Sequence, residues 1–311
     1  MWAWVVISAR VVDGVCLTGL GCGSKLCGRC MVIHLDAQPT EFMILSRSVY
    51  AEKFREVADF AFADGAAFAN RGRWREFFGP RIGPAFDGRV ILEVGCFDAG
   101  FLAKIAAKHP TTAFVGLDWK CKALYDGARQ IAEAGLGNVA LLRGRAQDVL
   151  KSFAEGEVDE IWVFHPDPCD REVELKNRLI AEPFLSDVHR VLRDGTSVLV
   201  LKTDHVGYYQ WVLGLFGLPE PEWFGERGAL AGASRLPRLR AGDMMNSEDI
   251  PAPSDVIRDR FEVAIHSGDY WNDAVAIALS AGRCFWGEAT LFESRFIKKK
   301  QPIYYFEMQK K

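Results

Sequence analysis

From residue 89 onward, short apolar runs alternate with segments in which apolar residues recur at helical spacing. Five runs rich in β-branched residues predict buried strands: Val90–Val94, Ala113–Leu117, Val139–Leu142, Ile161–Phe164 and Ser197–Leu201. Between them, helices are predicted around Leu102–Ala106, Leu124–Ala132 and Leu185–Leu192. This alternation predicts an α/β fold with a doubly wound, mostly parallel sheet over residues 89–216.

The pattern is different on both sides of this core. Residues 1–42 have no sustained period and are expected to form a loose extension, and residues 43–88 are expected to be helical and loop structure, with a helix over Ser48–Phe62. Residues 217–289 contain a stretch rich in Pro, Gly and charge and are expected to be an insertion. Two β-rich runs, Thr290–Phe296 and Pro302–Met308, predict a C-terminal hairpin over residues 290–311 that completes the sheet.

Composition restricts the possible partners. The 311 residues include 38 Lys and Arg against 41 Asp and Glu, a net charge of −3, so a nucleic acid would have to be held by a local basic patch. Candidate patches are Arg71, Arg73 and Arg75 around Trp74, and Arg295 with Lys298–Lys300. No apolar stretch reaches the roughly 18 residues that a membrane span needs, and we expect a cytoplasmic protein with no membrane partner.

Half of the eight cysteines, Cys16, Cys22, Cys27 and Cys30, lie in residues 1–42. Only Cys27 and Cys30 have the spacing of a ligand pair, whereas a structural zinc site usually shows two such pairs. We therefore expect no metal, and we expect residues 1–42 to be dispensable for folding.

Chemically informative residues follow the predicted strands, where parallel sheets bind ligands. The first strand leads into Glu93-Val-Gly95, the second into Asp118 and the third into Arg143-Gly-Arg145. The fourth leads into His165-Pro-Asp167-Pro168 and the fifth into Lys202-Thr-Asp204. No dinucleotide fingerprint or P-loop follows any strand, which disfavours NAD and nucleoside triphosphates. An acidic residue after the second strand suits the ribose hydroxyls of a nucleoside cofactor, although Asp118 could equally cap a helix.

The ordered motifs Glu93-Val-Gly95, Gly116-Leu-Asp118, Pro166-Asp-Pro168, Thr203-Asp204 and Thr290-Leu-Phe-Glu293 resemble those of the tRNA (guanine-N7) methyltransferases. The resemblance runs from about Phe78 to Asp204 and resumes at Thr290. It implies a seven-stranded class I methyltransferase sheet, S-adenosylmethionine as cofactor, tRNA as partner and methylation of guanine N7 in the variable loop. The sequence gives no indication of a stable protein partner.

The resemblance also implies roles for individual residues. It places Asp167 and Asp204 as catalytic residues, Glu93, Gly95, Asp118 and Ala146 at the cofactor, and Asp204, Thr290, Glu293 and Arg171 at the substrate.

The chain departs from this family in its first glycine turn, where Phe97 and Ala99 replace two glycines. It also has Cys169-Asp-Arg171 where the family has Trp-Pro-Lys. Two further hypotheses stay open at this point: a methyltransferase of the same fold that acts on another substrate, and a noncatalytic RNA-binding relative without a working cofactor site.

Overall fold

The computed structural model describes residues 50, 53–54, 57, 59–63, 65–220 and 245–311. The chain divides into two units, Met1–Met43 and Ile44–Lys311, and only the second contains described residues. The predictions for residues 1–42 and for Cys16, Cys22, Cys27 and Cys30 therefore lie outside the described residues, as does the part of the insertion between 221 and 244.

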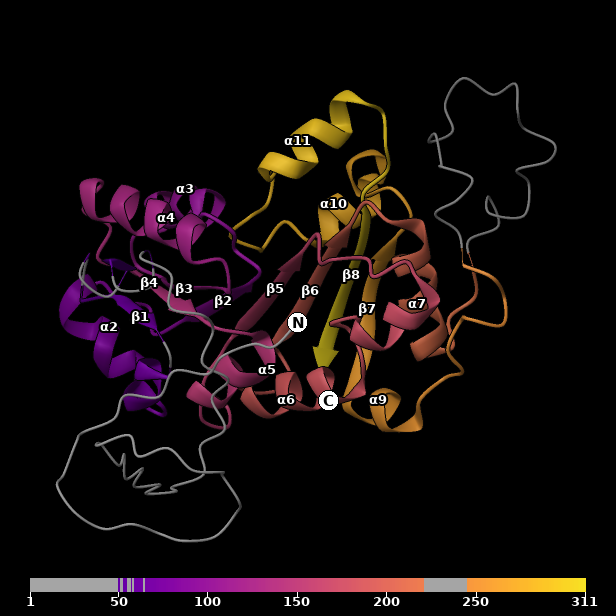
Figure 1. Cartoon of the computed structure of the whole chain (residues 1–311), viewed down its shortest axis with the longest axis horizontal. Coiled ribbons are helices and arrows are strands. Elements are labelled where there is room, and N and C mark those ends of the chain that lie inside the picture. Colours follow the sequence, from indigo (N-terminus) through magenta and orange to yellow (C-terminus); the bar gives the residue numbers. More distant parts are fainter. Residues whose placement is uncertain (1–49, 51–52, 55–56, 58, 64, 221–244) are drawn as a thin grey trace, which may run out of the picture. The chain divides into compact units, whose positions relative to one another are not determined.

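The second unit is built on one eight-stranded sheet with the order β1-β4-β3-β2-β5-β6-β8-β7. Its strands are β1 (Ala61–Ala63), β2 (Val90–Val94), β3 (Ala113–Asp118), β4 (Val139–Arg143), β5 (Glu160–Phe164), β6 (Val198–Thr203), β7 (Phe261–Ser267) and β8 (Tyr304–Lys310). The first six strands pair in parallel, and β8 is antiparallel to both β6 and β7 (Figure 1). The prediction of a doubly wound, mostly parallel sheet is confirmed.

Helices connect the parallel strands and cover the sheet. The α-helices are α2 (Trp74–Ile82), α3 (Gly100–Lys108), α4 (Cys121–Glu133), α5 (Ala146–Val149), α6 (Glu182–Val191), α7 (Val206–Phe216), α9 (Asp255–Arg260), α10 (Ala274–Leu279) and α11 (Leu291–Lys298). The 3-10 helices are η1 (Ala66–Asn70), η2 (Leu150–Ser152), η3 (Glu172–Asn177) and η5 (Tyr270–Asn272). No described helix is both long and apolar enough to cross a membrane.

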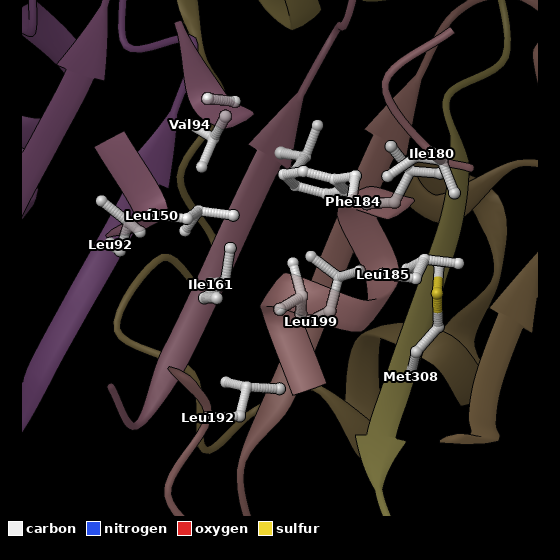
Figure 2. Packing of buried hydrophobic residues seen from close by; sticks show 14 of the residues in the cluster. Leu92, Val94, Leu150, Ile161, Ile180, Phe184, Leu185, Leu192, Leu199 and Met308 are labelled. Atoms are coloured by element: carbon white, nitrogen blue, oxygen red, sulfur yellow. The ribbon is translucent and has the colours of Figure 1, made fainter. Parts of the chain in front are cut away.

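Two apolar cores form because successive strand residues point to opposite faces of the sheet. Leu92 and Val94 of β2 pack on one face with α6 residues such as Phe184 and Leu185 (Figure 2). Ile91 packs on the other face with residues of α3 and α4. Since both faces are covered, the strands read as continuous apolar runs in the sequence.

The strand order reverses at β2, which has β3 on one side and β5 on the other. The helix after β2 leads toward β3 and β4, whereas β5 and β6 extend the sheet in the opposite direction. Diverging connections leave room beyond the carboxyl ends of these strands, and ligands of open α/β sheets bind there.

Two details of the predicted sheet were wrong. The segment expected as a strand over Thr290–Phe296 forms helix α11, and the antiparallel partner of β8 is β7, within the range expected to be an insertion. The sheet has eight strands rather than seven because the short strand β1 adds to the β4 edge. Ala61 and Phe62, at the end of the predicted helix Ser48–Phe62, belong to strand β1 and not to a helix. The structure describes only part of the rest of that segment.

Candidate functional site

A cavity of about 870 Å³ lies beyond the carboxyl ends of β2, β3, β4 and β5. Six of the predicted site residues line it: Glu93, Gly95, Asp118, Ala146, Asp167 and Thr290. Three others, Arg171, Asp204 and Glu293, lie outside this lining. The topology therefore brings together most of the residues that the sequence singled out.

The turn after β2 forms one wall of the cavity. Gly95 has φ +88°, a conformation that glycine adopts freely, and a Cβ on it would meet no atom within 4 Å. The N–H groups of Gly95 and Cys96 both donate to the Leu117 carbonyl, at 2.7 and 3.0 Å. The turn is thus tied to the end of β3 and leaves open space above its glycine.

Phe97 and Ala99 hold the same turn in left-handed conformations, with φ of 53° and 52°. A left-handed conformation is unfavourable by about 1 kcal/mol or more for a residue with a Cβ, whereas glycine adopts it without strain. The side chain of Ala99 is buried, whereas Phe97 is 36% exposed and lines the cavity. Phe97 therefore adds a phenyl ring to the wall of the cavity.

Asp118, at the end of β3, organises this turn. Its Oδ2 accepts from the Phe97 N–H at 2.9 Å and its Oδ1 accepts from the Lys120 N–H at 2.8 Å. Each carboxylate oxygen has a second lone pair, so the group can still accept hydrogen bonds from a ligand in the cavity.

Glu93, at the end of β2, is only 4% exposed, and its Oε2 has no hydrogen-bond partner among the described residues. Burial, with the nearby carboxylates of Asp118, Asp98 and Glu293, raises its pKa to about 8. A buried carboxyl with a free oxygen beside a cavity is suited to a cationic ligand, because the cation would supply the missing partner.

The loop after β5 forms the opposite wall. Asp167 is exposed, and its Oδ1 accepts from the Cys169 N–H at 3.2 Å. The buried Arg178 fixes the loop from behind, since its Nε donates to the Pro168 carbonyl at 2.8 Å and its Nη1 to the Gly207 carbonyl at 3.0 Å. The position of the Asp167 carboxylate is therefore set by a rigid backbone.

His165 is a cavity residue to which the sequence assigned no role. It lines the cavity in a left-handed conformation with φ 53°, and its Nδ1 lies 3.2 Å from Oδ1 of Asp204. The contact connects Asp204 to the cavity wall although Asp204 itself lies behind it. The sequence places His165 directly after the fourth predicted strand, but its contact with Asp204 is visible only in the fold.

Thr290 and Glu293 begin helix α11 with a capping box. The Glu293 N–H donates to Thr290 Oγ1 at 3.0 Å, and the Thr290 N–H donates to Glu293 Oε2 at 2.8 Å. The other oxygen of Glu293 lies 3.0 Å from Nζ of Lys202 on β6, and both side chains are fully buried. In this conformation Glu293 anchors the helix that carries Thr290 to the cavity.

The predicted cationic residues fall into different surroundings. Arg171 is exposed and paired with Glu174 on its own 3-10 helix. Arg75 binds Asp159 at 3.0 Å and the Gly88 carbonyl at 2.8 Å, two residues that precede β5 and β2. Arg75 therefore lies at the amino ends of the strands, the opposite end from the cavity.

Comparison with known proteins identifies the family of this chain. Residues 87–219 match the family profile Methyltransf_4, described as "Putative methyltransferase". A tRNA (guanine-N(7)-)-methyltransferase of Porphyromonas gingivalis is 34% identical over 178 residues, which cover 55% of this chain and 70% of that protein. The chain belongs to this methyltransferase family.

Two further relatives show how much of the chain the similarity covers. The tRNA (guanine-N(7)-)-methyltransferase of Cytophaga hutchinsonii is 38% identical over 137 residues, 44% of this chain and 59% of that protein. That of Christiangramia forsetii is 35% identical over 149 residues, 48% of this chain and 63% of that protein. The chain thus spans about three fifths of the length of these two relatives.

Proposed function

We propose that this protein transfers a methyl group from S-adenosylmethionine to N7 of a guanine in tRNA. The observation that supports the proposal most is a cavity lined by Glu93, Gly95 and Asp118 together with Asp167. The matched relatives are named tRNA (guanine-N(7)-)-methyltransferases, which favours this substrate over others.

The wall formed by β2 and β3 fits the cofactor. We assign the open space at Gly95 and the neighbouring Ala146 to close approach of the ligand, and Asp118 to its ribose hydroxyls. We assign the free oxygen of Glu93 to the cationic methionine end. The cofactor, when bound, supplies a methyl group on a positively charged sulfur, which makes that carbon electrophilic.

Asp167 is assigned to the guanine. N7 carries a lone pair and needs no strong base, so the protein must mainly hold N7 in line with the methyl carbon. The Asp167 carboxylate can accept hydrogen bonds from the N1–H and the amino group of guanine and offset the positive charge that forms on the base. Asp204 is assigned a positioning role, because it contacts the cavity wall through His165.

Helix α11 is assigned to the RNA surface. It brings Thr290 to the cavity and presents Arg295 and Lys298 on exposed turns, followed by Lys299 and Lys300. A protein with a net charge of −3 needs such a concentration of positive charge to hold a phosphate backbone. Arg75 is not included, because it lies at the opposite end of the strands.

The test is a calorimetric titration of the full chain with S-adenosylmethionine, followed by single-turnover methylation of unmodified tRNA. The proposal expects binding and a new N7-methylguanine, detected by nuclease digestion and mass spectrometry. Binding without tRNA methylation would favour another methyl acceptor. A protein that binds tRNA but no cofactor would be a noncatalytic relative, which Phe97 in the glycine turn would explain.

A further inference from the structure

We propose that Phe97 and Phe292 form a stacking platform for a nucleobase of the RNA substrate. The two rings, called the aromatic pair below, come from distant parts of the sequence: the turn after β2 and the first turn of α11. This inference rests on the proposed function, because it names the surface that would hold an unstacked base at the same cavity.

The aromatic pair lies at the mouth of the cavity. Both residues line it, yet Phe97 is 36% and Phe292 is 39% exposed. Their ring centroids are 6.5 Å apart with an angle of 66° between the planes, an edge-to-face contact. Two large apolar side chains are thus held against each other at an opening, where water covers a third or more of each surface.

A cation accompanies each ring. Lys120 Nζ lies 5.4 Å from the Phe97 centroid, and the Arg295 guanidinium lies 5.8 Å from the Phe292 centroid. Exposed aromatic rings flanked by Lys and Arg are the composition that binds single-stranded RNA, because bases stack on the rings and phosphates pair with the cations. A purely apolar partner would leave these two charges without a counterpart.

The pair is connected to the residues assigned to guanine. The Phe292 ring lies 6.2 Å from the imidazole of His165, two residues before Asp167. Phe97 is fixed from the cofactor side, since its N–H donates to Asp118. The aromatic pair therefore bridges the wall assigned to the cofactor and the wall assigned to the base.

The backbone of Phe97 supports a role for its side chain. Glycine would adopt the left-handed conformation of residue 97 without strain. The backbone therefore does not explain why a phenylalanine, which is strained in this conformation, occupies the position. Strained residues of this kind are concentrated at ligand sites.

The experiment compares Phe97→Ala and Phe292→Ala with Phe68→Ala, a matched control on η1. Phe68 is 40% exposed with the Arg71 guanidinium 5.4 Å from its ring, but it does not line the cavity. Loss of one stacked base should reduce kcat/KM for tRNA by about 5- to 150-fold in each test variant. We expect cofactor affinity to stay within about twofold and Phe68→Ala to behave as the parent. Phe292→Trp should retain activity and Phe292→Leu should not, because stacking needs a flat ring.

A second readout does not depend on catalysis. A single-stranded oligoribonucleotide carrying 2-aminopurine loses fluorescence when that base stacks, so binding to the parent should quench it and binding to Phe292→Ala should quench it much less. Equal quenching by parent and variant would overturn the inference, whether or not the parent methylates tRNA. Tighter cofactor binding by Phe97→Gly with no loss of methylation would also overturn it, because Phe97 would then obstruct the cofactor.

The two proposals fail in different ways. If the parent binds S-adenosylmethionine and RNA but leaves tRNA unmethylated, the proposed function fails, while the quenching experiment still decides the role of the aromatic pair. If tRNA is methylated and Phe292→Ala is fully active and quenches normally, only the stacking platform is rejected.

Discussion

Lys202 Nζ and Glu293 Oε1 lie 3.0 Å apart with both side chains fully excluded from water, and this contact fixes α11 to the end of β6. The aromatic rings of Phe164, Tyr270, Trp271 and Phe285 surround the Lys202 amino group, with centroids 4.7 to 5.4 Å away. Burial alone would raise the pKa of Glu293, but the Lys202 ammonium and His165 lower it, so the carboxylate is charged. A buried ion pair is therefore one of the contacts that hold the helix assigned to RNA.

Removal of only one charge of the Lys202–Glu293 pair should lower the stability of the protein more than removal of both charges. Lys202→Met leaves the Glu293 carboxylate buried without its counter-ion and should lower the free energy of unfolding by about 3–5 kcal/mol. The double variant Lys202→Met/Glu293→Leu has no unpaired charge and should recover much of that loss. Urea titrations followed by circular dichroism measure both. A single variant as stable as the parent would show that the pair does not anchor α11.

Asp118→Asn should weaken S-adenosylmethionine binding by about 5- to 150-fold, because a charge-assisted hydrogen bond to ribose contributes about 1–3 kcal/mol. Asn keeps one acceptor oxygen, so one of the two backbone hydrogen bonds from Phe97 and Lys120 can persist. Isothermal titration calorimetry measures the affinity. Asp126→Asn, at an exposed ion pair on α4, is the matched control and should bind as the parent does. Equal affinity in Asp118→Asn would remove Asp118 from the cofactor site.

Glu93 should make the protein less stable as pH rises. Its pKa is about 8 in the folded protein against an ordinary value of 4.5, so the folded state holds the proton more tightly than the unfolded state. The free energy of unfolding should therefore fall between about pH 4.5 and pH 8. Glu93→Gln does not titrate, so its free energy of unfolding should rise relative to that of the parent as pH increases across the same range. Parallel pH curves for parent and variant, obtained from thermal melts, would contradict the assignment.

Gly127 allows α4 to approach the turn after β2, because a Cβ there would lie 2.1 Å from the Asp98 carbonyl oxygen. Gly127→Ala must displace the helix or the turn, and we expect a loss of about 1–3 kcal/mol in stability with weaker cofactor binding. Gly79→Ala in α2 is the control, since its Cβ would meet no atom within 4 Å. That substitution should change stability by less than about 1 kcal/mol, because the gain in helix propensity is opposed by the restriction that Pro80 places on the residue before it. Similar melting temperatures for the two variants would disprove the close approach.

Asp167→Asn should reduce single-turnover methylation of tRNA by on the order of 10²-fold while cofactor affinity changes little. Asn retains an oxygen for the Cys169 N–H, so the loop should keep its shape and the loss should reflect the missing charge. Asp170→Asn, three residues after Asp167 in the same loop, is the nearby control and should keep the parental rate, since the Asp170 side chain is 54% exposed. A fully active Asp167→Asn enzyme would reduce Asp167 to a structural residue.

The parallel core could be predicted because its strands are buried on both faces and stand out as continuous apolar runs. The C-terminal part could not be predicted in the same way. Thr290–Phe296 contains apolar and aromatic residues that favour a strand, but the capping box and the ion pair to Lys202 stabilise a helix. The Thr-x-x-Glu spacing was visible in the sequence as a helix start, whereas Lys202 becomes its partner only through the tertiary fold.

Part of the cavity lining could be predicted from the ends of the strands, and Glu93, Gly95, Asp118 and Asp167 were placed on that basis. The contact between His165 and Asp204, and that between Phe97 and Phe292, join residues far apart in the chain. Spacing within a single sequence carries no information on such pairs. Arg75 shows the converse, since its proximity to Trp74 suggested RNA contact while the fold uses it to hold the amino ends of β2 and β5.

The order in which the strands are synthesised differs from their order in the sheet. Strand β8 is synthesised after β7 but lies between β6 and β7 in the sheet. Strand β7 therefore cannot be joined to β6 through the sheet until β8, residues 304–310, has left the ribosome. Helix α11 directly precedes β8 in the chain. Lys202 on β6 therefore has no ion-pair partner until Glu293 of α11 has also been synthesised. During translation, the part of the cleft formed by β2 to β5 can therefore take shape before the wall that carries Phe292, because α11 follows these strands in the chain.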